Sequence, residues 1–288
     1  MVPFVKSFKE TLKLPKVGIE ELRTKAFEEF SKIGVPNSRN EYWKFSDPSV
    51  ILNLDLKLSD TLEDIDEDYD LILCNGKINK NKVKGRTGSI SEGIKRGDIS
   101  EKFLEVNKNP FINLNSAFAT NGCYINLEKN STNKLKILNL ITNSEQIEQA
   151  VYPKLVVVTE SNSSTTIFEE FRISGKGTNF VNSAMNIFMA PGANLEHIIL
   201  DDYADNTYHI ANICVEQKKD SNYVSHNFSI GKKFARRDFM IELTETGANC
   251  DLNGLYFAGN QEHIDHHTTI EHMKENCTSN EHYKGILD

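Results

Sequence analysis

The chain has 288 residues, of which 39% are hydrophobic and 9% aromatic, so it can form one large core or a small domain beside a larger one. The formal net charge of −8 argues against general nucleic-acid binding, because phosphates are usually held by clustered Lys and Arg. No apolar run approaches the roughly 18 residues of a membrane helix, and the first residues lack the apolar stretch of a secretory signal. We therefore expect neither nucleic-acid nor membrane partners.

The first 50 residues are predicted to be mainly helical. Apolar residues recur at steps of three and four between residues 19 and 33, which gathers them on one face of a helix. They are Ile19, Leu22, Ala26, Phe30 and Ile33. The aromatic side chains of Tyr42, Trp43 and Phe45 follow, and we expect them to anchor the helix on its neighbours rather than to stack on a ligand.

The pattern between residues 60 and 149 is mixed. Short strands are predicted at residues 70–76 and 135–141, and a weak helical pattern covers residues 92–106. We expect residues 1–150 to form an N-terminal region of helical and mixed α/β structure.

From residue 151 to residue 288, short turns of small residues recur at nearly constant spacing. Successive turns lie 30, 28, 27 and 29 residues apart, and strand-like alternating runs enter and leave them. A fixed period of about 20 to 50 residues indicates stacked repeats, which for strand–turn–strand units means a β-solenoid or β-helix. The hairpins of an antiparallel sandwich fit the same period less well. The equivalent turn positions are Ser163, Ala193, Ser221, Ala248 and Cys277.

Five of the eight histidines lie between residues 263 and 282, near Asp265 and Cys277. Imidazole and carboxylate are ligands of zinc and iron(II), so His263, Asp265 and His267 are candidate metal ligands. In a strand these three side chains point to one side at steps of about 7 Å, which is too far apart for a single ion, and His266 points to the other side. We therefore expect hydrogen-bonded structural histidines. A metal-dependent enzyme or metal-binding protein that uses the histidines at 263–282 is the alternative.

Motifs of nucleophilic catalysis and of phosphate binding are absent from the sequence. The adjacent carboxylates Asp201 and Asp202 would face opposite sides of a strand, which is poor geometry for acid–base partners. Five cysteines lie 27 or more residues apart without a Cys-x-x-Cys pair, which indicates reduced thiols and a cytoplasmic location. These features disfavour an exported, carbohydrate-active β-helix. We expect a protein that is not an enzyme by itself.

Several sequence motifs resemble those of the SufB/SufD family of iron–sulfur cluster assembly proteins, and they are more similar to the motifs of SufD than to those of SufB. They are FEEFSKIGVPNSRNEYWKFSD at 27–47, NLNSAF at 113–118 with Gly122, ARRD at 235–238, LNGLY at 252–256, HIDHH at 263–267 and YKGILD at 283–288. The resemblance extends over essentially the whole sequence.

The resemblance implies a mainly β fold, with a right-handed parallel β-helix core and a small N-terminal α/β domain. It implies a non-catalytic scaffold that joins a SufB-like subunit and a SufC-like ATPase and binds no cofactor stably itself. It assigns no metal ligand to His263, Asp265 or His267. In the family the β-helix continues past the last string into a Cys-x-His-Gly segment and C-terminal helices. We therefore expect the sequence to be truncated, with an incomplete β-helix at residues 151–288.

Overall fold

The computed structural model describes residues 2–14, 18–59, 61–63, 65–120, 122–144, 147–203, 205–231, 233–259 and 261–288. The helices are α1 (Val2–Thr11), α2 (Glu20–Ile33), η1 (Glu41–Trp43), η2 (Ser49–Asn53), α3 (Ile90–Arg96), η3 (Glu101–Leu104) and α4 (Pro110–Phe118). The strands are β1 (Lys57–Leu58), β2 (Leu71–Cys74), β3 (Lys77–Asn81), β4 (Arg86–Ser89), β5 (Cys123–Leu127), β6 (Thr132–Asn143), β7 (Glu148–Val151), β8 (Lys154–Thr159), β9 (Ser164–Gly175), β10 (Thr178–Met189), β11 (Asn194–Asp202), β12 (Thr207–Gln217), β13 (Asn222–Ile230), β14 (Phe234–Leu243), β15 (Asn249–Ala258), β16 (Ile264–His272) and β17 (Thr278–Leu287).

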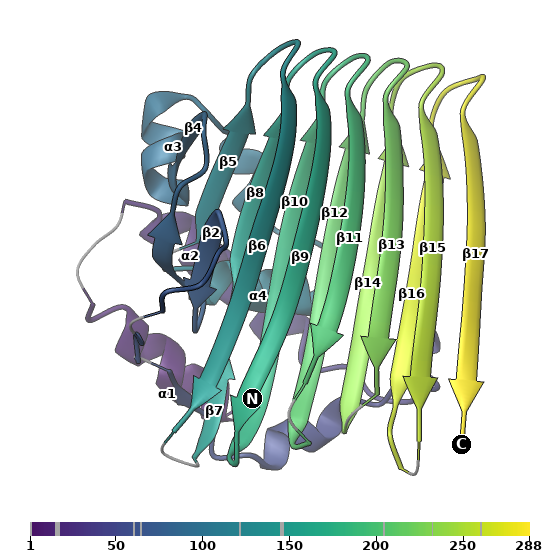
Figure 1. Cartoon of the computed structure of the whole chain (residues 1–288). Coiled ribbons are helices and arrows are strands. Elements are labelled where there is room, and N and C mark those ends of the chain that lie inside the picture. Colours follow the sequence, from purple (N-terminus) through teal and green to yellow (C-terminus); the bar gives the residue numbers. More distant parts are fainter. Residues whose placement is uncertain are drawn as a thin grey trace.

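Two sheets face each other along a stack of coils, and successive coils pair in parallel (Figure 1). Sheet A has the order β16-β14-β12-β10-β8-β5-β4, with β7 beside β10 and β1 beside β7, and sheet B has the order β17-β15-β13-β11-β9-β6-β2-β3. In sheet B, Asn194 pairs with Ser164 and with Asn222, and Asn249 pairs with Asn222 and with Thr278. These pairs reproduce the spacing of the turns. The predicted parallel β-helix is therefore confirmed and the antiparallel sandwich is wrong, while the right-handed coiling stays a prediction.

Each turn that connects sheet A to sheet B contains one residue in the left-handed region, with φ between 54° and 76°. Glycine adopts this conformation freely, and asparagine and aspartate adopt it more readily than other side chains. This backbone requirement explains why the turns could be recognised in the sequence. The residues are Asn130, Asn162, Gly192, Asp220, Gly247 and Asn276.

The parallel pairing begins before the expected division at residues 150 and 151. Strand β5 pairs with β8, and β6 pairs with β9 over twelve residue pairs, so both strands belong to the stack. The division into two domains stays a prediction. The expected strands at 70–76 and 135–141 are confirmed as β2 and β6. The weak helical pattern at residues 92–106 corresponds to the C-terminal part of α3, which ends at Arg96, and to η3.

The N-terminal helices cover the outer face of sheet A, behind the sheet in Figure 1. Phe4, Phe30 and Phe111 from the helices form one cluster with Phe180 and Tyr208 from sheet A. A separate core fills the space between the two sheets. Among the described residues, no helix has the length and apolar character required to span a bilayer.

The predicted N-terminal helix is confirmed as α2, but two details of the prediction were wrong. Ile33 is 43% exposed, because it ends the helix beyond the covered face. Trp43 is 4% exposed and packs as expected, whereas Tyr42 and Phe45 are 67% and 84% exposed. Trp43 is therefore the only one of these three aromatic side chains that is buried, while the ring of Tyr42 makes an edge contact with the ring of His267 at the surface.

Replacing Gly175 with alanine tests the close approach of the first coils. Gly175 ends β9 with a φ of +108°, and a Cβ there would lie 2.6 Å from the carbonyl oxygen of Asn143. We expect Gly175→Ala to lower the free energy of unfolding by about 2 to 4 kcal/mol, through backbone strain and overpacking together. Urea denaturation measures the change.

Gly97 provides a matched control for this substitution. Its φ is +74° and a Cβ would meet nothing within 4 Å, so Gly97→Ala adds backbone strain without a clash. We expect a loss of about 1 kcal/mol. Equal losses for the two variants would contradict the steric argument.

Candidate functional site

The three candidate metal ligands lie on the outer face of sheet A, against the N-terminal region. The Nε2 atom of His263 lies 2.9 Å from the Oγ atom of Ser46. The Oδ2 atom of Asp265 accepts hydrogen bonds from Ser46 Oγ at 2.5 Å and from Arg236 Nη1 at 2.7 Å. His267 Nδ1 lies 3.6 Å from an oxygen of Asp238. The predicted alternation is confirmed, since these side chains share one face.

Arg236 connects this cluster to the N-terminal segment. Its side chain is 3% exposed and donates to both oxygens of Asp238, as well as to Asp265. Its Nη1 atom also donates to the carbonyl oxygen of Tyr42 at 2.8 Å, and its guanidinium lies 4.0 Å from the ring centre of Trp43. A guanidinium over an indole face is an attractive contact that strengthens when water is excluded. Arg236 therefore fastens residues 42 and 43 to β14 and β16.

The described part of the chain contains no group of three or more His, Cys, Asp or Glu side chains arranged to hold a metal ion. His263 and Asp265 share the hydroxyl of Ser46, and burial lowers the pKa of His263. His272 and His282 are exposed and belong to different strands. The metal hypothesis stays a prediction, and the contacts of its candidate residues are those of a junction between two parts of the chain.

A second polar network, which the sequence did not reveal, lies between the two sheets. The Nε2 atom of His197 is 3.0 Å from Oε2 of Glu169, and its Nδ1 atom is 3.2 Å from the hydroxyl of Tyr223. Asn139 donates to the other carboxylate oxygen of Glu169 at 2.7 Å. All four side chains are buried. Each of these hydrogen bonds has one donor and one acceptor when the hydroxyl of Tyr223 donates to Nδ1 of His197 and Nε2 of His197 donates to Glu169.

Arg237 continues this network on the inner face of sheet A. It is 3% exposed, and its Nη2 atom donates to Asp201 at 2.6 Å. Burial raises the pKa of Asp201, but the charge of Arg237 together with His209 and the hydroxyl groups of Ser229 and Tyr203 outweighs it and leaves the pKa below its usual value. Ser229 donates a further hydrogen bond to Asp201 at 2.6 Å. Asp201 is buried and Asp202 is exposed, so their predicted separation is confirmed.

The buried His209 and the half-buried His266 complete the interior network. His209 lies 2.6 Å from the hydroxyl of Tyr203 and 2.8 Å from that of Ser183. His266 lies 3.0 Å from the amide nitrogen of Asn227. Burial, followed by the charge of Arg237, lowers the pKa of His209 to about 3 and that of His266 to about 4. Both rings are therefore neutral at neutral pH.

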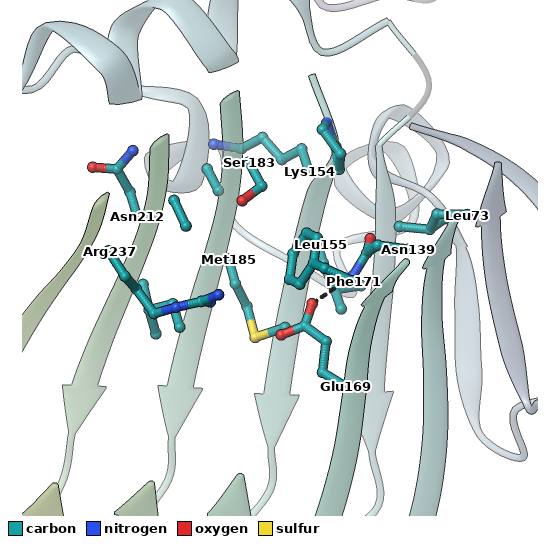
Figure 2. A pocket seen from close by; sticks show the side chains of 14 residues that line it. Leu73, Asn139, Lys154, Leu155, Glu169, Phe171, Ser183, Met185, Asn212 and Arg237 are labelled. Carbon is teal, nitrogen blue, oxygen red and sulfur yellow. Dashed lines mark hydrogen bonds between the residues drawn. The ribbon is translucent and has the colours of Figure 1, made fainter. Parts of the chain in front are cut away.

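Two cavities of about 10 Å³ lie along this network, and Arg237 lines both. Figure 2 shows the first cavity, with Glu169, Ser183 and Met185 around it. A volume of about 10 Å³ corresponds to roughly one water molecule, so neither cavity holds an organic substrate. The network orders the interior of the β-helix around these two cavities.

Charged residues at inward strand positions are the one feature of the sequence that indicates a buried polar network, although they do not identify its members. In the alternating runs, Glu169 stands between the apolar inward residues Ile167 and Phe171, and Asp201 follows Ile199 at the same two-residue step. A charged residue in an inward position needs a buried partner. The sequence does not show which coil supplies that partner.

The family model for the SUF system FeS cluster assembly, SufBD core domain, matches residues 140–288, which is more than half of the chain. The chain belongs to the SufBD family. The matched range contains the strands from β7 to β17 and most of the interior network. The resemblance read from the sequence strings is thereby confirmed.

Individual relatives are distant. The chain is 27% identical over 187 residues to an iron–sulfur cluster assembly SufBD family protein of Synechocystis, which covers 62% of this chain and 41% of that protein. It is 21% identical over 269 residues to the iron–sulfur cluster assembly protein SufD of Escherichia coli, with 89% of this chain and 63% of SufD covered. A SufBD family protein of Mycobacterium tuberculosis is 30% identical over 95 residues, which are 33% of this chain and 24% of that protein. The chain thus spans less than two thirds of each relative.

Replacing Asp265 with asparagine tests the junction. Asp265→Asn removes the charge that Arg236 and Ser46 contact, and leaves a buried guanidinium with one carboxylate instead of two. We expect the free energy of unfolding to fall by about 1 to 3 kcal/mol. Glu245→Gln is the control, since Glu245 lies 3.7 Å from Lys218 at the surface and contributes below about 0.5 kcal/mol. A loss no larger than that of the control would show that the junction is not held by charge.

The two neutral histidines predict that acid destabilises the fold. Their pKa values are about 3 and 4 in the folded protein against 6.5 as the ordinary value, so the unfolded chain binds more protons below pH 6.5. Stability is greatest above pH 6.5 and falls as the pH decreases toward the folded values, by up to about 1.4 kcal/mol per pH unit for each histidine. Urea denaturation at pH 7, 6 and 5 measures this slope. His209→Gln should reduce it, and an unchanged slope would contradict the assignment.

Proposed function

We propose that the protein is a non-catalytic scaffold subunit of an iron–sulfur cluster assembly complex, which acts in the cytoplasm with a SufB-like subunit and a SufC-like ATPase. The observation that carries the proposal is the match of the SufBD core domain to residues 140–288, a range that folds as one continuous β-helix. The relatives from Escherichia coli and Plasmodium falciparum are both named iron–sulfur cluster assembly protein SufD.

The form of the molecule supports a scaffold. Coils stacked in register make an elongated body whose outer faces keep fixed spacings (Figure 1). The interior is occupied by an apolar core and by the network around Glu169, Asp201 and Arg237, with two cavities of about 10 Å³. In this proposal iron and sulfide are cargo of the complex and are handled where subunits meet.

Co-expression with a SufB-like and a SufC-like protein from the same organism tests the proposal. We expect the three proteins to co-purify, and ATP hydrolysis to depend on the SufC-like subunit. The isolated chain should hydrolyse no ATP. Hydrolysis by the isolated chain, or the absence of any complex, would overturn the scaffold assignment.

Metal analysis of the isolated protein tests the alternative function. A metal-dependent protein would contain stoichiometric zinc or iron, and the double variant His263→Ala/His267→Ala would lose it. The scaffold proposal predicts substoichiometric metal in both proteins. Asn280→Ala, on the outer face of sheet B, is a control that leaves the histidine cluster untouched.

A further inference from the structure

The outer face of sheet B carries a contiguous block of exposed apolar side chains, here called the sheet-B patch. Ile230 pairs with Phe257 and Phe257 pairs with Ile286, so three apolar side chains lie side by side on adjacent strands. Their exposed fractions are 52%, 43% and 54%. Exposed apolar patches of this contiguity mark interaction surfaces. The patch consists of the half-buried side chains Leu200 and Leu255 and the exposed side chains Phe228, Ile230, Phe257 and Ile286.

One row of the patch, made of Leu200, Phe228 and Leu255, extends across the sheet toward its N-terminal strands. Its next members are Glu170 and Leu138, and other parts of this chain cover them. At its N-terminal end, Ile65 and Tyr69 pack against Leu138, and the hydroxyl of Tyr69 donates to Glu170 at 2.5 Å. The cover ends there among the described residues, and Figure 1 shows the strands beyond β9 open on this side.

The charges beside the patch are mainly acidic. Asp202 ends β11 in the same row as Ile230 and Phe257, and on the other side a row with His226 and His282 separates the patch from Glu196 and Asp251. Arg172, which pairs with Asp202, is already bound by Glu67 and Glu170. The basic exceptions are Lys284 beside Leu255 and the exposed Lys233, three residues after Ile230.

This charge distribution favours a basic partner over a second copy of the chain. Two chains of net charge −8 repel each other, whereas Lys and Arg side chains at the border of a partner complement the acidic rows.

The hydrogen bonding of the sheet defines the form of the occupant. Strands β11, β13 and β15, which carry five of the six patch residues, are paired on both sides, so this part of the patch offers side chains and no free backbone groups. A segment that docks there must satisfy its own backbone, which an α-helix does. We propose that the sheet-B patch docks an amphipathic helix of a partner protein, whose apolar stripe is bordered by Lys and Arg. This surface does not depend on the proposed function.

Fluorescence anisotropy with synthetic helical peptides tests the docking surface. The probe is a labelled Leu/Lys peptide of about 18 residues, or five helical turns, and a Leu/Glu peptide of the same apolar pattern serves as the acidic comparison. We expect the basic peptide to bind, and the acidic one to bind at least about tenfold more weakly. Ile230→Ser/Phe257→Ser should weaken binding of the basic peptide by about tenfold or more.

Phe45→Ser is the matched control, because Phe45 is 84% exposed in the N-terminal segment and lies outside the patch. It should change the affinity less than twofold, roughly the effect of a residue outside an interface. Circular dichroism should show the same fold for all variants, since the replaced side chains are exposed.

Three results would overturn the proposal. The first is that the basic peptide binds neither protein or binds the double variant as tightly as the original chain. The second is that the acidic peptide binds as tightly as the basic one. The third is dimerisation of the original chain in sedimentation velocity that the double variant loses, which would make a second copy the occupant. None of these results bears on whether the chain joins SufB-like and SufC-like subunits.

Discussion

Parallel pairing between successive coils is the constraint on which the rest of the structure depends. Each coil satisfies its backbone groups through the coils before and after it, so an error in the length of one coil would propagate along the stack. The pairing also brings distant residues into rows. Ser183, Ala211, Arg237 and His266 are successive partners on four strands, although they span more than eighty residues of sequence. The interior network exists because the register places these residues beside one another.

The two adjacent arginines show how strongly this register is specified. Arg236 points outward to Asp238, Asp265 and Trp43, and Arg237 points inward to Asp201. A shift of β14 by one residue would exchange the two faces, so Arg237 would lose Asp201 and Arg236 would lose Asp265 and keep Asp238, which lies on the same strand. A buried charge without a partner destabilises a protein strongly, by about 3 to 5 kcal/mol. The polar groups therefore select one alignment of coils among several that an apolar core alone would accept.

The repeat could be predicted because its turns require residues with unusual backbone freedom, and such residues remain visible in a sequence. The alternation of a strand likewise assigned His263 and His267 to one face. The network around Glu169 and His197 could not be predicted, because its members come from different coils and no local pattern connects them. Tyr42 and Phe45 were misplaced for another reason: in an irregular segment, spacing does not determine which aromatic side chain points inward. The contacts of His263 and Asp265 with Ser46 and Arg236 could not be predicted either, because these partners lie far away in sequence.

The two outer faces of the β-helix differ in a way that bears on function. The face of sheet A is used internally, because helices, Trp43 and the junction at Arg236 cover it. Among the described residues, the face of sheet B is covered at its first strands and then presents Phe228, Ile230 and Phe257 to solvent. Under the proposed scaffold function, this open face is where a partner would bind. The register of the coils then fixes the distance of that face from the junction at Arg236, so the constraint that builds the fold also sets the spacing of its outer surfaces.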